Sequence, residues 1–391
     1  MSKQYRYISA DSHLEVAPDR WSPRMPAKYR DLAPHLVRTS TGGDGWVVGQ
    51  MKPREVALDL YGGKGREFWQ PFGQRYEDTP GTGSPEQRIR EQEQDNVDAE
   101  VFFPNQAGGP KLWRSIGDDA AYTAMLRAYN DWLAEEYCSV DPDRLIGLGL
   151  IPYSSLNDAL AELEYCFKLG LKGIVLHGFP SGVGYPTPED DTFYSTALEM
   201  NMPLTVHIDL DRTGDRAGPL FKYPGASEEA LERLGFTDMV QQCSKFARGG
   251  GLNVIQLVLS GVFDRFPNLK IFWAENQIGW VPLFMEMADV RYRRHIHWAG
   301  NLLNFKPLNR LPSEYIRDHN LWGFQQDRPG VELRHHLKIN HLMWASDFPH
   351  QESEWPNSHA VIDSNFSGIP EEERYRMVAG NAIDFFHLDS D

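Results

Sequence analysis

Cysteine is scarce in this chain of 391 residues, and its three cysteines, Cys138, Cys166 and Cys243, show none of the short spacings typical of a zinc finger. A sparse, odd set of thiols also disfavours a disulfide framework and favours a reducing compartment. No stretch approaches the roughly 20 apolar residues of a membrane span, and no apolar run follows a basic start at the N-terminus. We therefore expect a soluble, cytoplasmic protein that makes no contact with a membrane.

Clusters of positive charge are also absent. The formal net charge is −16 at pH 7, and no group of Lys and Arg residues offers a surface for phosphates. Because nucleic-acid binding depends on such clusters, we expect no nucleic-acid partner. No GxGxxG motif follows any apolar run, which disfavours a dinucleotide-binding fold. The expected partner is a small-molecule substrate.

The chain does contain a regular alternation of apolar runs and helix-like segments. The candidate strands lie in residues 5–14, 98–104, 144–152, 171–178, 202–209, 271–275, 320–324 and 341–346. Eight β/α units in a chain of this length predict an α/β protein built as a (β/α)8 TIM barrel.

We predict a single domain covering residues 1–391, in which the other segments are insertions into this barrel or extensions of it. Residues 17–85 are rich in Pro, Gly and Trp and predict an irregular N-terminal insertion, or cap. We expect a long loop at about 210–236 and closing C-terminal helices within 356–388.

Polar side chains follow the candidate strands at the points where the strands end. Residues two apart in an extended chain share a face, so Asp11 and His13 can point at the same object. In a TIM barrel, functional groups gather where the strands end and the βα loops begin. One such residue alone is more often structural, but six at one rim predict a metal site. The six predicted ligands are Asp11, His13, His177, His207, Glu275 and Asp347. For His177 a contact with the substrate is the alternative to a place on the metal.

Four sequence segments resemble a known family: DSH, TVHID, RFPNLKIFWAENQIGWVP and MWASDFPHQESEWPNS. They are similar to the amidohydrolase-related family of the metal-dependent hydrolase superfamily, in the branch that includes the aminocarboxymuconate-semialdehyde decarboxylases. The resemblance implies a (β/α)8 barrel whose metal is held by two residues of the first strand, a His of the fifth and an Asp of the eighth. These positions correspond to Asp11, His13, His207 and Asp347.

The chain departs from the family pattern at two positions. Many relatives begin with His-x-His, where this chain has Asp11 in place of the first His. A His commonly follows the sixth strand, where this chain has Glu275. In the decarboxylases that His is regarded as a proton carrier, so its replacement weakens the decarboxylase assignment.

Charge counting predicts how many metal ions the six residues hold. Asp11, Glu275 and Asp347 bring three negative charges and the histidines bind as neutral imidazoles, so one divalent ion would leave a net negative charge. An uncompensated buried charge is unfavourable. We therefore predict two ions, bridged by Glu275 or Asp11. The mixed oxygen and nitrogen ligands are compatible with zinc, manganese or iron.

These observations lead to three alternative functions. The preferred one is a metal-dependent hydrolase that attacks the carbonyl carbon of an ester, thioester or amide with metal-activated water. Asp347 is then the candidate base and acid, Glu275 a bridging ligand, and His350 a second candidate for proton transfer. The alternatives are a non-oxidative decarboxylase of a small aromatic or unsaturated acid and a non-catalytic metal-binding barrel. A homodimer is compatible with the family resemblance.

Overall fold

The computed structural model describes residues 5–55, 59–68, 72–105, 109–211, 220–221, 223–229, 239–244 and 247–388. The long loop expected at 210–236 falls largely outside these ranges.

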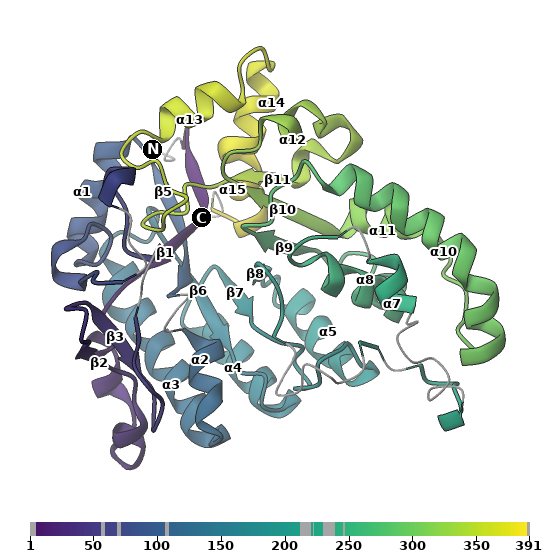
Figure 1. Ribbon diagram of the computed structural model, residues 1–391, viewed down its shortest axis with the longest axis horizontal. Coiled ribbons are helices and arrows are strands. Elements are labelled where there is room, and N and C mark those ends of the chain that lie inside the picture. Colours follow the sequence, from purple (N-terminus) through teal and green to yellow (C-terminus); the bar gives the residue numbers. More distant parts are fainter. Residues whose placement is uncertain are drawn as a thin grey trace.

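Eight parallel strands form the centre of the molecule, as predicted (Figure 1). Each strand pairs with its neighbours in chain order, from β1 at one end of the sheet to β11 at the other. Almost every strand residue is buried, which explains the near-continuous apolar runs of the sequence. The strands are β1 (Ile8–Leu14), β5 (Ala99–Pro104), β6 (Leu145–Ile151), β7 (Gly173–Leu176), β8 (Leu204–His207), β9 (Ile271–Ala274), β10 (Asn320–Phe324) and β11 (Leu342–Trp344).

Hydrogen bonds at the end of β11 bring the first and last strands together. The backbone N–H of His13 donates to the carbonyl of Phe348 at 2.8 Å, and that of Asp347 donates to the carbonyl of Asp11 at 3.0 Å. The sheet is therefore nearly closed into a barrel. Strand β1, which carries Asp11 and His13, meets the segment from β11 to Asp347 at this seam.

Helices surround the sheet in the expected alternation (Figure 1). The helical segment expected at 237–264 is divided in the structure into α7, α8 and α9. None of the helices in the described ranges has the length and apolar character needed to cross a membrane. The helices are α1 (Pro85–Asp95), α2 (Pro110–Trp113), α3 (Asp119–Trp132), α4 (Leu156–Lys168), α5 (Asp191–Glu199), α7 (Met239–Cys243), α8 (Gly251–Ser260), α9 (Val262–Arg265), α10 (Val281–Leu303), α11 (Pro312–His319), α12 (Arg328–Glu332), α13 (Ser358–Asn365), α14 (Glu371–Tyr375) and α15 (Asn381–Phe386).

The segment between β1 and α1 contains more regular structure than its composition indicates. Short 3-10 helices alternate with a small antiparallel sheet of β2 (His35–Arg38), β3 (Asp44–Val47) and β4 (Arg54–Glu55). The buried Trp46 of β3 donates its indole N–H to the hydroxyl of Tyr76 at 2.5 Å. Tyr76 in turn contacts Asn105, the residue after β5. The cap is thus joined to the barrel close to the strand ends.

Three strand ends have an unusual backbone conformation. Ile208 after β8, Glu275 after β9 and Asp347 after β11 have φ values of 58°, 55° and 56°. This left-handed region is uncommon for residues other than glycine and costs on the order of 1 kcal/mol or more at each position. These three residues lie where the strands end, at the rim of the barrel.

Candidate metal centre and active site

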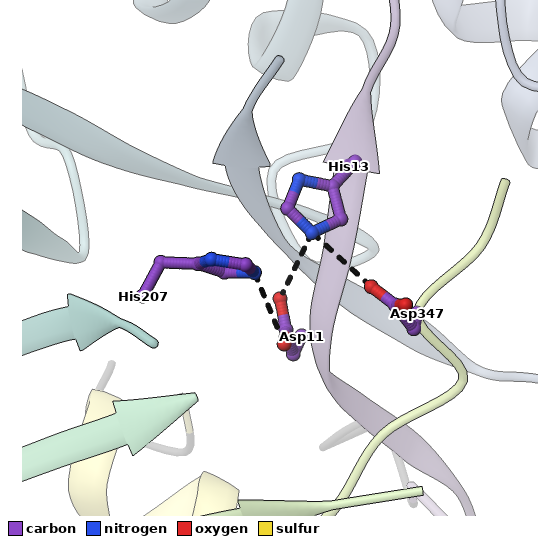
Figure 2. A group of neighbouring side chains, drawn as sticks. All are labelled: Asp11, His13, His207 and Asp347. Atoms are coloured by element: carbon purple, nitrogen blue, oxygen red, sulfur yellow. Dashed lines mark ion pairs between the residues drawn. The ribbon is translucent and has the colours of Figure 1, made fainter. Parts of the chain in front are cut away.

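Four of the six predicted ligands meet at this rim. The ligand atoms of Asp11, His13, His207 and Asp347 all lie within 4.8 Å of one another, and all four side chains are buried. They come from β1, the end of β8 and the segment after β11. Figure 2 shows His207 and Asp347 on opposite sides of Asp11, with the Nε2 atom of His13 directed at both aspartates.

The distances fit four side chains around one cation, and two of the three are too long for direct hydrogen bonds. His13 Nε2 lies 3.5 Å from Asp11 Oδ1 and 3.2 Å from Asp347 Oδ1. His207 Nε2 lies 3.6 Å from Asp11 Oδ2. The carboxylate oxygens of both aspartates and the Nε2 atoms of both histidines have no hydrogen-bond partner in the described part of the chain. Buried polar atoms are rarely left unpaired, so this set fits a divalent cation at its centre.

A hydrogen bond prepares His13 to act as a ligand. Its Nδ1 lies 2.9 Å from the carbonyl oxygen of Pro104. A carbonyl can only accept, so the proton of the neutral ring is on Nδ1 and the lone pair of Nε2 points into the cluster.

The charges of the cluster also favour a cation. Burial and the neighbouring carboxylates of Asp347 and Glu275 raise the pKa of Asp11 well above its usual value. Burial also raises the pKa of Asp347, but His350 and His13 outweigh it and the net pKa is lowered. Burial lowers the pKa of His13 and of His207, which keeps both rings neutral. Two carboxylates and two neutral imidazoles together carry the charge that one divalent ion balances.

Glu275 and His177 lie outside this group of four. Glu275 Oε2 is 3.2 Å from His207 Nε2, and its carboxylate groups with those of Asp347 and the exposed Glu352. Burial and the charge of Asp347 raise the pKa of Glu275 to about 8. His177 is buried after β7 but joins none of the metal-ligand groups found among the described residues. Its role as a ligand stays a prediction.

His350 is buried beside the cluster and holds Asp347 in place. Its Nδ1 lies 3.4 Å from Asp347 Oδ1, its Nε2 lies 3.1 Å from Glu15 Oε1, and its ring stacks on that of His13 at 3.8 Å. Glu15 also accepts from Asn105, which contacts Tyr76 of the cap. A chain of buried polar contacts therefore runs from the cap to the cluster.

Sequence reasoning missed Glu15, although a signal was present. Asp11 and His13 belong to β1 and Glu15 directly follows it, and the intervals of two predict that all three side chains lie on one face of an extended chain. The side chain of Glu15 is fully buried at the end of that face.

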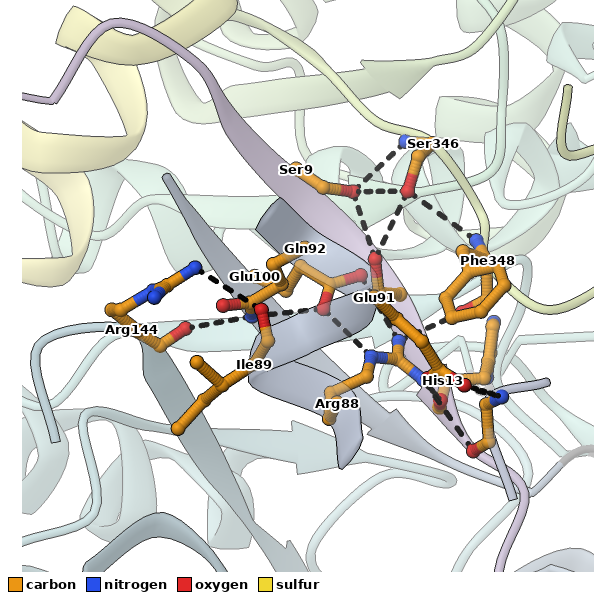
Figure 3. Close-up of polar contacts among 12 residues, drawn as sticks. Ser9, His13, Arg88, Ile89, Glu91, Gln92, Glu100, Arg144, Ser346 and Phe348 are labelled. Atoms are coloured by element: carbon orange, nitrogen blue, oxygen red, sulfur yellow. Dashed lines mark hydrogen bonds and ion pairs between the residues drawn. The ribbon is translucent and has the colours of Figure 1, made fainter. Parts of the chain in front are cut away.

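Arg88 was missed as well, and nothing in its sequence context marks it. It belongs to α1, is 1% exposed, and forms a two-point ion pair with Glu100 of β5 at 2.7 and 3.0 Å. Its other N–H groups donate to the carbonyls of His13 and Phe348, both at 3.1 Å (Figure 3). One guanidinium therefore supports the backbone on both sides of the seam that carries the cluster.

The fold and the cluster define a TIM-barrel enzyme whose metal-ligand residues lie at the strand ends. Comparison with known proteins identifies the family: the amidohydrolase family model Amidohydro_2 matches residues 10–388. The chain belongs to this family, as its sequence motifs indicated.

Similar curated proteins are decarboxylases. Decarboxylase orsB of Emericella nidulans is 26% identical over 263 residues, covering 65% of this chain and 73% of that protein. The 2-amino-3-carboxymuconate-6-semialdehyde decarboxylase of Dictyostelium discoideum is 22% identical over 388 residues, covering 98% and 93%.

Solved structures share the fold. An amidohydrolase from Mycobacterium avium subsp. paratuberculosis matches with a TM-score of 0.69 at 18% identity, covering 98% of this chain and all of that one. The 5-carboxyvanillate decarboxylase of Novosphingobium aromaticivorans, solved with bound manganese, has a TM-score of 0.64 at 17% identity and covers 98% and 97%.

The relatives contradict the prediction of a hydrolase. They favour the alternative, a non-oxidative decarboxylase. The physical reason for the error is that both reactions use the same kind of ligand set, which can activate water or hold a carboxylate. Residue types at strand ends do not distinguish these uses. The assignment of Asp347 as the base for water attack depended on hydrolysis and is withdrawn with it.

Proposed function

We propose that the protein is a metal-dependent, non-oxidative decarboxylase of a small aromatic acid. The observation that carries the proposal is the buried group of Asp11, His13, His207 and Asp347, whose ligand atoms lack partners, at the mouth of a barrel related to decarboxylases. The substrate for which one structural neighbour is named, 5-carboxyvanillate, is an aromatic acid of this kind.

The proposed cofactor is one divalent ion, with manganese preferred because two structural neighbours hold it. Asp11, His13, His207 and Asp347 would hold this ion, and their two negative charges match its charge. A second ion, as charge counting predicted, has further carboxylates nearby in Glu275, Asp347 and Glu352. In that group Asp347, and not Glu275, would be the ligand shared by both ions.

A bound ion supplies fixed positive charge that attracts the substrate carboxylate and stabilises negative charge that develops on oxygen. The residues of the chain then orient the aromatic ring of the substrate and transfer one proton to it. His350 and Glu15 keep Asp347 fixed, and the hydrogen bond to Pro104 keeps the His13 ring fixed.

Glu275 is the proposed proton donor. It occupies the position after the sixth barrel strand, it lies beside His207, and its side chain is 21% exposed, so it reaches both the cluster and the open side of the mouth. The proton passes from the Glu275 carboxyl to the ring carbon that bears the substrate carboxylate. The bond between that carbon and the carboxylate carbon then breaks, its electron pair restores the ring, and carbon dioxide leaves. Solvent returns a proton to Glu275.

Carbon dioxide release tests the function. The manganese-loaded protein is incubated with 2,6-dihydroxybenzoate, 5-carboxyvanillate and related hydroxybenzoates, and released carbon dioxide and the decarboxylated phenol are quantified together. We expect equal amounts of both from at least one acid, and none after chelation. Absence of carbon dioxide release from the whole set by fully loaded, folded protein would refute the proposal.

The Glu275→Gln variant tests the proton donor. Loss of a general acid typically slows turnover by about 10² to 10⁴-fold. We expect this loss with metal content unchanged, because Glu275 lies outside the group of four. Glu352→Gln, which removes the exposed carboxylate nearby, is the matched control and should keep most of the activity. A Glu275→Gln variant as fast as the natural protein would exclude the role, and a variant that lost half of its metal would instead make Glu275 a ligand of a second ion.

A further inference from the structure

A buried asparagine side chain joins the two strand ends that carry His207 and Glu275. Asn276 directly follows Glu275 in the sequence and is 6% exposed. Its amide N–H groups donate to the backbone carbonyl of Ile208, the residue after β8, at 3.1 Å and to that of Ala274, the last residue of β9, at 2.8 Å. One amide group therefore connects the corner after β8 with the corner after β9.

The other polar atoms of Asn276 have partners as well. Its Oδ1 accepts from the backbone N–H of Gly250, just before α8, at 2.9 Å. Its carbonyl accepts from the indole N–H of Trp280 at 2.8 Å, and its backbone N–H donates to the carbonyl of Gly323 in β10 at 3.2 Å. A buried amide with all of its donors and acceptors paired has one orientation, so Asn276 is a fixed point between these elements.

Two glycines before α8 leave the space that this amide needs. A Cβ atom on Gly249 would collide with Asn276 Oδ1, and one on Gly250 would lie 2.9 Å from the carbonyl oxygen of Ile208. Gly249 also has a φ of 44°, in the left-handed region that favours glycine. The close approach of this segment to Asn276 therefore depends on both glycines.

The sheet itself holds His207 but not Glu275. His207 pairs with Ala274 in the parallel ladder between β8 and β9, so its backbone is fixed by the two strands. Glu275 lies beyond the last paired residue of β9 and has a φ of 55°, which persists only where surrounding contacts impose it. The donated bonds of Asn276 impose it on the side of β8, where the Glu275 carboxyl lies 3.2 Å from His207 Nε2.

We propose that Asn276 is a positioning residue that sets the direction of the Glu275 carboxyl for proton transfer. The inference rests on the proposed function, because it names the residue that makes Glu275 an effective proton donor. Asn276 transfers no proton itself. Its bonds to Ile208 and Ala274 hold the corner after β9 against the corner after β8, so that the carboxyl stays beside His207 and faces the substrate.

The Asn276→Ala variant tests the proposal by kinetics. Without the amide the Glu275 carboxyl can move, and a displacement of about 1 Å can lower turnover by about 100-fold. We expect kcat on an acid that the natural protein decarboxylates to fall by about 10 to 100-fold, with KM and manganese content within about twofold of the natural values. A natural kcat in this variant would overturn the proposal.

The matched control is Asn253→Ala, which removes another buried asparagine at the same rim. Asn253 Oδ1 accepts from the backbone N–H of Leu210 at 3.1 Å, in the loop after His207, and makes no bond to the segment of Glu275. This variant loses a comparable buried bond, so it should lose stability but keep its kcat. An equal fall of kcat in Asn253→Ala would show general loosening of the rim and would overturn the specific role of Asn276.

The Gly249→Ala variant displaces the amide without removing it. The added methyl group collides with Asn276 Oδ1, so kcat should fall in the same direction as in Asn276→Ala. The double variant should be no slower than Asn276→Ala alone, because the amide that the methyl group displaces is already gone. Losses of kcat that multiply in the double variant would mean that Gly249 acts by another route, and would count against the proposal.

Crystal structures of the manganese-loaded natural protein and of Asn276→Ala make the result independent of turnover. We expect the Glu275 carboxyl to lie about 1 Å or more farther from His207 in the variant, with His207 itself unmoved. A carboxyl that stays in place would overturn the positioning role even if carbon dioxide release is found. A displaced carboxyl in a protein that releases no carbon dioxide would support the positioning role and refute the proposed function alone.

Discussion

The guanidinium of Arg88 connects one side chain and two backbone carbonyls that come from distant parts of the chain. It pairs with Glu100 and donates to the carbonyls of His13 and Phe348. All of these contacts are buried, so removing the cation leaves a buried carboxylate without its partner. Breaking such a pair typically costs about 3–5 kcal/mol.

We therefore predict that Arg88→Met lowers the free energy of unfolding by about 3 kcal/mol or more in urea denaturation. The control is Arg90→Met on the exposed side of the same helix, which should change stability by no more than about 0.5 kcal/mol. Because Arg88 supports the carbonyl of His13, manganese affinity should fall in Arg88→Met as well. Equal stability of the two variants would contradict the role given to the buried pair.

Some of the individual residues of the site could be predicted from the sequence. The strand-end rule and the family motifs correctly brought Asp11, His13, His207 and Asp347 together, because parallel strands bring their ends to one rim. The same rule does not fix the depth or direction of a side chain, so it could not separate His177 from the group of four. Arg88 could not be found, since an arginine in a helix usually indicates a solvated face.

Among the secondary-structure elements, α1 and α13 are joined by one buried carboxylate. Asp95 at the end of α1 accepts from the backbone N–H and the hydroxyl of Ser358 at the start of α13, at 2.9 and 2.5 Å. Burial outweighs these bonds and raises the pKa of Asp95 to about 6. An unfolded Asp has a pKa of about 3.9, so between about pH 4 and pH 6 the folded state keeps a proton that the unfolded state has lost.

The sign of the resulting pH dependence follows directly. The state that binds more protons is favoured at low pH, so this group's contribution to stability falls as the pH rises through that interval. We predict that the stability of the natural protein relative to Asp95→Asn falls by about 2 kcal/mol between pH 4 and pH 7. Glu93→Gln, an exposed carboxylate on the same helix, should show no such trend. A flat difference in urea unfolding across this range would contradict the raised pKa.

The order of the elements was predictable, but their irregular parts were not. Apolar runs located all eight strands within a few residues, because a strand buried on both faces has few polar positions. The division of the helical segment within 237–264 and the small sheet of β2, β3 and β4 escaped prediction. Both depend on tertiary contacts, such as that between Trp46 and Tyr76, that local sequence patterns do not encode.

For the whole molecule, the cluster lies across the point where the barrel closes. Asp11 and His13 belong to the first strand, Asp347 follows the last, and His207 ends β8 in between. Without a cation, the buried carboxylates of Asp11 and Asp347 repel each other, as the raised pKa of Asp11 indicates. A divalent ion bound there would remove this repulsion and connect both edges of the sheet, so metal binding should stabilise the entire barrel.

We predict that saturating manganese raises the free energy of unfolding by about 2.7 kcal/mol at a free concentration 100 times the dissociation constant. Thermal unfolding with and without chelator measures this increment, and elemental analysis of the loaded protein should find one ion per chain. Asp347→Asn should stay folded but lose the increment and the ion, and its metal-free form should be less stable than the natural one, because the lowered pKa of Asp347 means that His350 and His13 stabilise its charge in the folded state. Glu352→Gln should keep both the stability increment and the bound ion.

These measurements separate a functional site from a structural one. A cluster evolved only for stability would make the metal-free protein unfold, and Asp347→Asn would unfold with it. A cluster evolved for catalysis tolerates repulsion between Asp11 and Asp347 in the metal-free barrel, because the rest of the fold, including the Arg88 support beneath the seam, holds the strands in place. A folded but inactive Asp347→Asn variant is therefore the result that the decarboxylase proposal requires, and an unfolded one would assign the ion to the fold.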